Sequence, residues 1–219
     1  MMITRHNQNA RPTGIVRGLL LLLALQFCAG AALATTIRGM SIDEVANQAE
    51  LIFEGVVLTH AVQRESGSGL IHTYVTFSVA DVIKGNFSGD TLELRFTGGE
   101  YNGEIVEVSG LSIPPVGEAG IYFVESATRA LLNPLLGWSQ GHYVIVEENG
   151  ERQVNTASRE PVLEVRAMAD IPVSIRRPQP LIEGKSDAAG GVITDSSALS
   201  IERPLTVEQF KTRIRALVD

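Results

Sequence analysis

The chain has 219 residues, of which 18 are Lys or Arg and 25 are Asp or Glu, so its formal net charge is −7. A chain with this negative charge and no cluster of basic residues binds nucleic acid and anionic lipid poorly, which excludes both as expected partners. Its length is sufficient for one domain with a substantial core.

Residues 1–34 have the three parts of a secretory signal peptide. Three arginines precede an apolar run, Gly18 to Phe27, and the small residues that follow end in Ala32-Leu33-Ala34. A membrane anchor is the alternative, but the apolar stretch is at the lower limit of length for a spanning helix. We therefore expect cleavage after this pattern, a mature chain that begins at Thr35, and no stable membrane insertion after cleavage.

The single cysteine, Cys28, lies inside the predicted signal peptide. Lipid attachment would require small residues before the cysteine, but Gln26 and Phe27 stand there. The mature chain then has no cysteine, and its charge is 15 minus 25, or −10, because three arginines leave with the signal peptide. An exported chain without disulfides suits a bacterial periplasmic or secreted protein better than a eukaryotic one.

A short helix is predicted near the start of the mature chain, because Ser41 and Glu44 have the spacing of a capping box. Strand-like segments follow, with glycine-rich turns and almost no helix between them: residues 51–64, 73–83, 91–97, 104–108, 121–125, 142–147 and, more weakly, 153–156. This pattern indicates a mostly β domain over residues 35–166, either a sandwich or a barrel.

The segment 73–83 has the most regular alternation of apolar and polar residues. Successive side chains of a strand point to opposite faces, so we expect Phe77 in the core and Tyr74 on the other face. Lys84-Gly85 begins the turn that follows. We interpret Lys84 as a solvated turn residue and Gly85 as a position that requires positive φ.

Residues 167–204 contain several prolines and the pair Gly190-Gly191 but no sustained periodicity, which predicts an extended or disordered linker. Residues 205–219 form a predicted amphipathic helix, with a capping box at Thr206 and Gln209 and an apolar stripe that includes Phe210 and Ile214. Two roles are open for this helix, docking on the β domain or binding a partner, and we favour docking.

One motif has catalytic form: residues 137–141, Gly-Trp-Ser-Gln-Gly, match the nucleophile elbow of α/β-hydrolases. That motif follows a strand and opens a helix, whereas here Asn133-Pro134 precedes it and a predicted strand follows. The only histidine after Ser139 is His142. A hydrolase site near these two residues is therefore the alternative to a chain without catalytic residues.

Metal and cofactor sites are not expected. The mature histidines are His60, His72 and His142, and none has a second ligand at the spacing of a known zinc motif. Three acids at 100, 104 and 107 lack the spacing of a calcium loop, so we interpret them as solvated. No glycine loop of the phosphate-binding kind is found in the sequence.

Four segments resemble a widespread group of uncharacterised exported bacterial proteins: AELIFEGVV, HTYVTFSVADVIKG, VGEAGIYFV and GWSQGHYVIV. The first three are also similar to the netrin-like module of tissue inhibitors of metalloproteinases. Over residues 41–146 the resemblance implies an OB-like small closed β-barrel and a link to extracellular proteolysis. Those inhibitors chelate the protease zinc through an N-terminal cysteine, which a chain beginning Thr35-Thr36 does not have.

Two classes of function follow: an exported binding module for an unknown protein or peptide, or the exported hydrolase described above. A binding module would use loops at one end of the barrel, and the loops concerned are residues 98–103, 111–117 and 131–138. The candidate partner-binding residues within them are Tyr101, Pro114, Pro115 and Trp138. The alternative role of each loop is to close the barrel, and for Trp138 we favour packing in the core or at its rim.

Overall fold

The computed structural model describes residues 37–170, 181–182, 188–194 and 203–218. The chain divides into two units, Met1–Ala34 and Thr35–Asp219, and all described residues belong to the second. The expected signal peptide lies outside the described residues. The described part is mostly β, as predicted, and has two α-helices. In these ranges no helix combines the length and the apolar character needed to cross a bilayer.

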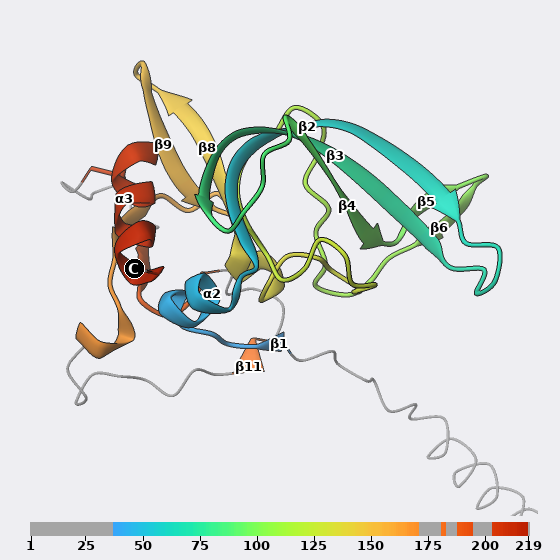
Figure 1. Cartoon of the computed structure of the whole chain (residues 1–219), viewed down its shortest axis with the longest axis horizontal. Coiled ribbons are helices and arrows are strands. Elements are labelled where there is room, and N and C mark those ends of the chain that lie inside the picture. Colours follow the sequence, from blue (N-terminus) through green and yellow to red (C-terminus); the bar gives the residue numbers. More distant parts are fainter. Residues whose placement is uncertain (1–36, 171–180, 183–187, 195–202, 219) are drawn as a thin grey trace, which may run out of the picture. The chain divides into compact units, whose positions relative to one another are not determined.

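The main sheet has six strands, and all neighbouring strands are antiparallel. In spatial order they are β4 (Thr91–Thr97), β3 (Ile71–Lys84), β2 (Leu51–Arg64), β7 (Ala119–Val124), β8 (His142–Glu148) and β9 (Glu151–Thr156). Figure 1 shows how strongly the long β2–β3 hairpin curves. Three register shifts between these two strands contribute to that curvature.

The predicted closed barrel is not found among the described residues, because β4 and β9 remain edge strands of an open sheet. Residues 132–136 instead run between the ends of β4 and β7. The Thr97 amide at the end of β4 donates to the carbonyl of Leu132, and the Leu136 amide donates to the carbonyl of Phe123 in β7. Backbone groups of β4 and β7 are thus satisfied by residues 132–136, so the OB-type closure remains a proposal.

Three pairs of short strands accompany the main sheet: β1 (Ile37–Arg38) with β11 (Leu181–Ile182), β5 (Gly99–Tyr101) with β6 (Glu104–Val106), and β10 (Val162–Val165) with β12 (Val192–Thr194). Two 3-10 helices, η1 (Trp138–Gly141) and η2 (Met168–Asp170), complete the described elements.

The predicted linker 167–204 contains described residues with fixed partners. Strand β12 pairs with β10, Ala189 is buried, and the Gly190 amide donates to the carbonyl of Met40. The prediction of an extended or disordered linker did not include these fixed pairings. Alternation could not reveal them, since a strand of three residues is too short to show a period. Residues 171–180, 183–187 and 195–202 lie outside the described part of the chain.

Helix α2 (Ile42–Gln48) begins and ends with side-chain caps. At its start, Ser41 and Glu44 form the predicted capping box. At its end, the Lys84 ammonium donates to the carbonyls of Ala46, Asn47 and Ala49 at 2.8, 2.6 and 2.8 Å. The prediction that Lys84 is only solvated is therefore wrong: its positive charge faces the carbonyl end of the helix.

The neighbouring glycine follows from the same contact. Gly85 has φ 94°, and a Cβ there would lie 2.5 Å from the carbonyl oxygen of Glu50. Only glycine therefore fits between the end of β3 and the end of α2. The Lys-Gly pair ends the regular alternation of β3 because the chain meets the helix there.

We expect Lys84→Met to lower the free energy of unfolding by about 1–2 kcal/mol. The methionine keeps most of the aliphatic stem but leaves three helix carbonyls without their donor. Burial lowers the pKa of Lys84, so the cost of desolvating the ammonium offsets part of the gain from these hydrogen bonds. Urea denaturation measures the change.

The matched control is Arg129→Met, because the Arg129 side chain is 60% exposed and pairs at the surface with Glu125. This variant should change the free energy by less than about 0.5 kcal/mol. Equal losses in the two variants would contradict a capping role for Lys84.

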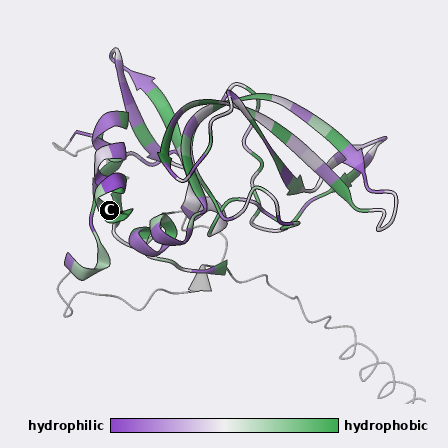
Figure 2. Cartoon of the chain, viewed as in Figure 1, coloured by the Kyte–Doolittle hydropathy of each residue, from purple (hydrophilic) through white to green (hydrophobic). Residues whose placement is uncertain are grey.

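The first part of β2 and most of β7 are buried on both faces, and their alternate residues enter two different cores. Ile52 and Phe123 belong to the helix-side core, whereas Phe53 and Tyr122 belong to the sheet-side core. Figure 2 shows hydrophobic and hydrophilic residues alternating along the long β2–β3 hairpin, where the outer face is not covered by the helices. Phe77 is fully buried in the sheet-side core, and Tyr74 is partly exposed.

Helix α3 (Val207–Val218) covers the helix-side core together with α2 (Figure 1). Phe210 and Ile214 are fully buried, and the Phe210 ring lies 4.8 Å from that of Tyr143. Charges also hold the helix, since the Lys211 ammonium lies 2.8 Å from Glu54 and 3.0 Å from Asp81. The helix is thus docked on the sheet in the structure.

Candidate functional site

The β5–β6 hairpin is built by a two-residue turn. Asn102 and Gly103 have φ of 50° and 81°, the positive values that a type I′ turn requires. The turn sets the register, with Gly99 opposite Val106, Glu100 opposite Ile105, and Tyr101 opposite Glu104. Paired residues share a face, so the hairpin has one face with Gly99 and Tyr101 and another with Glu100 and Ile105.

The first face of the hairpin packs on the β2–β3 hairpin. A Cβ at Gly99 would collide with the Thr73 hydroxyl, whose proton is donated to the carbonyl of Gly98 at 2.7 Å. The Arg64 guanidinium lies 5.7 Å from the centre of the Tyr101 ring and 2.5 Å from the Glu104 carboxylate. The chain can approach this closely because Gly98 and Gly99 adopt φ of 109° and 127°.

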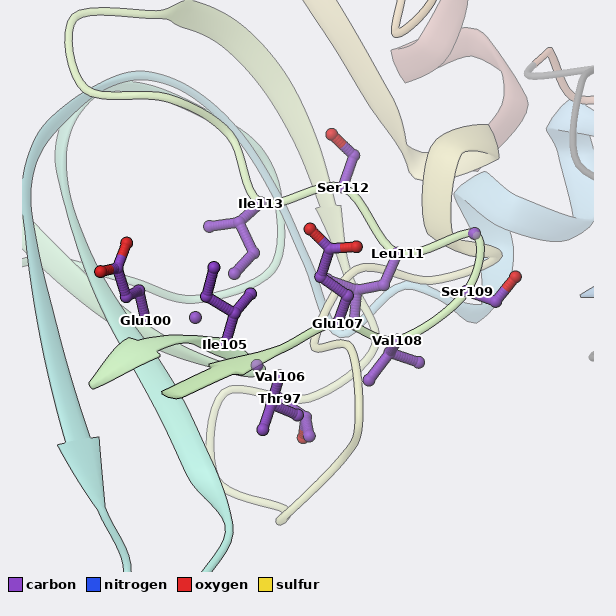
Figure 3. Close-up of a pocket in the computed structure, with 13 residues that line it drawn as sticks. Thr97, Glu100, Ile105, Val106, Glu107, Val108, Ser109, Leu111, Ser112 and Ile113 are labelled. Carbon is purple, nitrogen blue, oxygen red and sulfur yellow. The ribbon is translucent and has the colours of Figure 1, made fainter. Parts of the chain in front are cut away.

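The second face borders a cleft of about 650 Å³, which we call the hairpin cleft and which is lined by residues 97–100 and 105–113. Figure 3 shows Ile105 between the carboxylates of Glu100 and Glu107, with Ile113 next to it on the segment that forms the opposite wall. Leu111 and Ile113 pack against the sheet-side core. That wall is therefore anchored to the folded domain.

The hairpin cleft is apolar in its centre and acidic at its sides. Ile105 is 64% exposed, the largest exposed fraction among the exposed large apolar side chains of the described residues. The two carboxylates, Glu100 and Glu107, are the charged groups among its lining residues. Neither forms an ion pair or a side-chain hydrogen bond within the described residues, whereas Glu104 on the other face is paired with Arg64.

The four candidate partner-binding residues surround this region but do not line the hairpin cleft. Tyr101 is partly buried beneath Arg64. Pro114 is buried, and its carbonyl lies 2.8 Å from the His60 ring, while Pro115 is exposed. Trp138 is partly buried, and its ring lies near Gly110, where a Cβ would be 3.7 Å away.

The third predicted loop, residues 131–138, serves mainly as a cover for the sheet. Asn133, Pro134, Leu135 and Leu136 are buried, and Leu135 belongs to the sheet-side core. Its backbone pairs with the end of β7, through the Glu125 amide and the carbonyl of Pro134. The buried half of this loop is therefore unavailable to a partner.

The Gly-Trp-Ser-Gln-Gly motif forms the 3-10 helix η1, which leads into strand β8. A nucleophile elbow has the reverse order, strand first and helix second. Ser139 is partly exposed, and within the described residues no hydrogen bond joins its side chain to His142. The serine therefore lacks the activating contact that a nucleophile requires.

His142 has an acidic partner that the sequence did not indicate. Its Nε2 lies 2.8 Å from Glu118 Oε1, and both side chains are 5% exposed. Arg159 pairs with the second oxygen of Glu118 at 2.7 Å, and Tyr122 stacks on the His142 ring at 5.3 Å. Burial, followed by the charge of Glu118, raises the pKa of Tyr122. This cluster joins β7, β8 and the turn after β9, and it does not line the hairpin cleft.

The other histidines and acidic side chains of the described residues do not form a metal site. Within the described ranges no group of three or more His, Cys, Asp or Glu side chains is placed to hold a metal ion. Buried His72 leaves its Nε2 without a hydrogen bond, 3.9 Å from Glu65.

Sequence reasoning missed Ile105 and Glu118. The Asn102-Gly103 pair is the signal that predicts the hairpin, and period-two alternation from Ile105 to Glu107 then gives the shared face. Glu118 had no such signal, because its partner lies 24 residues further along the chain.

Comparison with known proteins adds no relative to this description. No family model matches the chain, and neither a curated protein nor a solved structure was found to match it.

Proposed function

We propose that this chain is an exported, non-catalytic binding module that holds a polypeptide segment of a partner protein in the hairpin cleft. The observation that carries the proposal is Ile105, which lies 64% exposed in the centre of a formed cleft (Figure 3). An exposed apolar side chain flanked by polar groups on a rigid hairpin is typical of an interaction site.

Polypeptide suits the hairpin cleft because much of its lining is backbone and small side chains. Gly110 lies along it together with the exposed Ser109 and Ser112, so polar groups border the apolar centre. Extended segments are recognised through main-chain hydrogen bonds together with pockets for alternate side chains.

The proposal also includes export of the chain and its relationship to OB-type, netrin-like barrels. The predicted signal peptide supports periplasmic or secreted localisation. The curved sheet and the capped helix before it support an OB-type, netrin-like origin, in which residues 132–136 occupy the opening between β4 and β7. A link to extracellular proteolysis rests on the resemblance alone.

The experiment is site-specific photo-crosslinking in the extracytoplasmic fraction of the native cells. A photoreactive residue at position 105 should give a discrete adduct, whereas the same residue at position 193 should not. Ile193 is also exposed at 36%, but it lies on β12, which pairs with β10. Ile105→Ser should also remove capture of the same partner. Equal adducts from both positions, or none from position 105, would contradict the proposal.

The second candidate is the hydrolase, which one observation favours: His142 has a carboxylate partner in Glu118, as the base of a catalytic triad does. Its test is turnover of ester and peptide substrates by the purified protein. If Ser139→Ala abolished a measured turnover while the thermal transition stayed unchanged, the hydrolase would replace the binding module.

A further inference from the structure

We infer that the segment bound in the hairpin cleft is basic, an extended stretch of a partner protein with Lys or Arg next to apolar residues. The inference rests on the proposed function and specifies its ligand. It follows from three properties of the hairpin cleft: the sign of its charges, the absence of internal partners for them, and their position relative to Ile105.

The first property is charge complementarity. Glu100 and Glu107 are the ionisable side chains among the lining residues, and no lysine, arginine or histidine of the described part of the chain lines the hairpin cleft. An acidic segment would place its charges against these two carboxylates without a compensating group. A second copy of this chain is also a poor occupant, since each copy of the expected mature chain has a formal net charge of 15 minus 25, or −10.

The second property separates these carboxylates from their neighbour on the same hairpin. Glu104 is on the opposite face and is held by Arg64. Glu100 and Glu107 form no ion pair or side-chain hydrogen bond within the described residues. Each can therefore accept hydrogen bonds from a bound ammonium or guanidinium without breaking an internal contact.

The third property is the apolar surface between the two acids. Ile105 precedes Glu107 by two positions, and Glu100 is directly opposite Ile105 in the hairpin register (Figure 3). Lys and Arg side chains lay their aliphatic stems on apolar surface and keep the charged end among polar groups. Ile105 and Ile113 supply that surface, and the carboxylates lie at its sides.

The test uses three fluorescein-labelled peptides that differ at two positions: a Gly-Ser-Val-Lys-Val-Lys-Val-Ser-Gly probe and its counterparts with Gln or Glu in place of both Lys. Fluorescence anisotropy with the purified mature protein should show the Lys probe binding at least about tenfold more tightly than the Gln probe. The Glu probe should not bind. Binding of the Lys probe should weaken between about 50 and 500 mM NaCl.

Substitutions of the three glutamates test which carboxylates cause the preference for the Lys probe. The double variant Glu100→Gln and Glu107→Gln should remove most of the preference for the Lys probe. Glu104→Gln is the matched control, because it removes a carboxylate from the same hairpin on the face held by Arg64. All three positions are exposed, so the variants should keep the thermal transition of the parent.

Several outcomes would overturn the inference. Equal binding of the Lys and Gln probes, with both lost in Ile105→Ser, would leave the binding module standing but show that it does not select basic segments. An equal loss in Glu104→Gln and in the double variant would show a general charge effect. No binding of the Lys probe would also reject the inference, and crosslinking at position 105 would then judge the proposed function separately. A crosslinked dimer of this chain would identify the occupant as a second copy.

Discussion

Phe77→Ala should lower the free energy of unfolding by about 3–5 kcal/mol. The Phe77 ring is fully buried in the sheet-side core and lies 5.5 Å from the ring of Phe53 and 4.8 Å from that of Tyr122, both in edge-to-face geometry. Truncation removes these contacts and leaves a cavity in the centre of the curved sheet, where the backbone on both sides is held in strands. Urea denaturation followed by circular dichroism measures the loss.

The matched control is Tyr74→Ala on the same strand. Tyr74 points to the other face and is partly exposed, so its removal should cost less than about 2 kcal/mol. Similar losses at the two positions would mean that the outer face of β3 is packed as densely as the inner face at this point, which the structure contradicts.

Lys211→Met should lower the free energy of unfolding by about 3 kcal/mol at neutral pH. The Lys211 and Glu54 side chains are both 6% exposed, and Asp81 shares the ammonium. Methionine fits the path of the aliphatic stem but leaves the Glu54 carboxylate buried with only the half-exposed Arg152 as a cationic partner. Removing one partner of a buried ion pair is costly because the remaining charge stays out of water.

The cost should depend on pH, with a sign set by the carboxylates. Burial raises the pKa of Glu54, but hydrogen bonds and charges from Lys211 and Arg152 outweigh it and hold the pKa below its usual value. Because folding lowers its pKa, the Glu54 carboxylate stabilises the fold at pH values above the ordinary pKa of 4.5. This contribution is lost as the pH falls through the pKa of Glu54 in the folded state. In Lys211→Met the burial of Glu54 dominates instead, so acidification should narrow the difference between the variant and the parent.

Glu208→Gln is the control for this cluster. Glu208 also pairs with Lys211, at 2.7 Å, but its side chain is 73% exposed, and its loss should cost less than about 1 kcal/mol. If Lys211→Met cost no more than Glu208→Gln, or if its cost were the same at acidic and neutral pH, the buried pair would not be what holds α3 on the sheet.

Sequence reasoning succeeded where a single segment carries its own signal. Alternation gave the bounds of β2 and β4, and the capping boxes at Ser41 and Thr206 marked the starts of both helices. The burial of Phe77 followed from period two alone. These features depend on neighbours in sequence, which is why a pattern reveals them.

Sequence reasoning failed where the partner of a residue lies far away along the chain. Lys84 has the composition of a turn residue, and only the fold brings the end of α2, 35 to 38 residues earlier, within reach of its ammonium. The closed barrel failed for a related reason. The sequence shows strands, but the choice between a closing strand and a covering loop depends on how residues 132–136 pair with β4 and β7.

The sequence predicts where the candidate site lies in the chain, but it does not predict how the acids of the site are arranged. The glycine pair and the acids at 100, 104 and 107 point to the right segment, but the sequence predicts all three acids to be solvated. The structure distinguishes them, since Glu104 is paired with Arg64 and Glu100 is on the other face of the hairpin. That division depends on the hairpin register, which is set by Asn102-Gly103.

The two cores can be completed at different stages of chain synthesis. All buried members of the sheet-side core lie between Leu51 and Leu135, whereas the helix-side core also needs residues from Val162 to Ile214. A chain that has emerged only as far as β9 can bury Phe77 but leaves the other face of the same sheet, with Phe123 and Tyr143, without its cover. A chain of that length therefore exposes apolar surface on the helix side of the sheet until α3 packs there, and such transiently exposed surface favours aggregation.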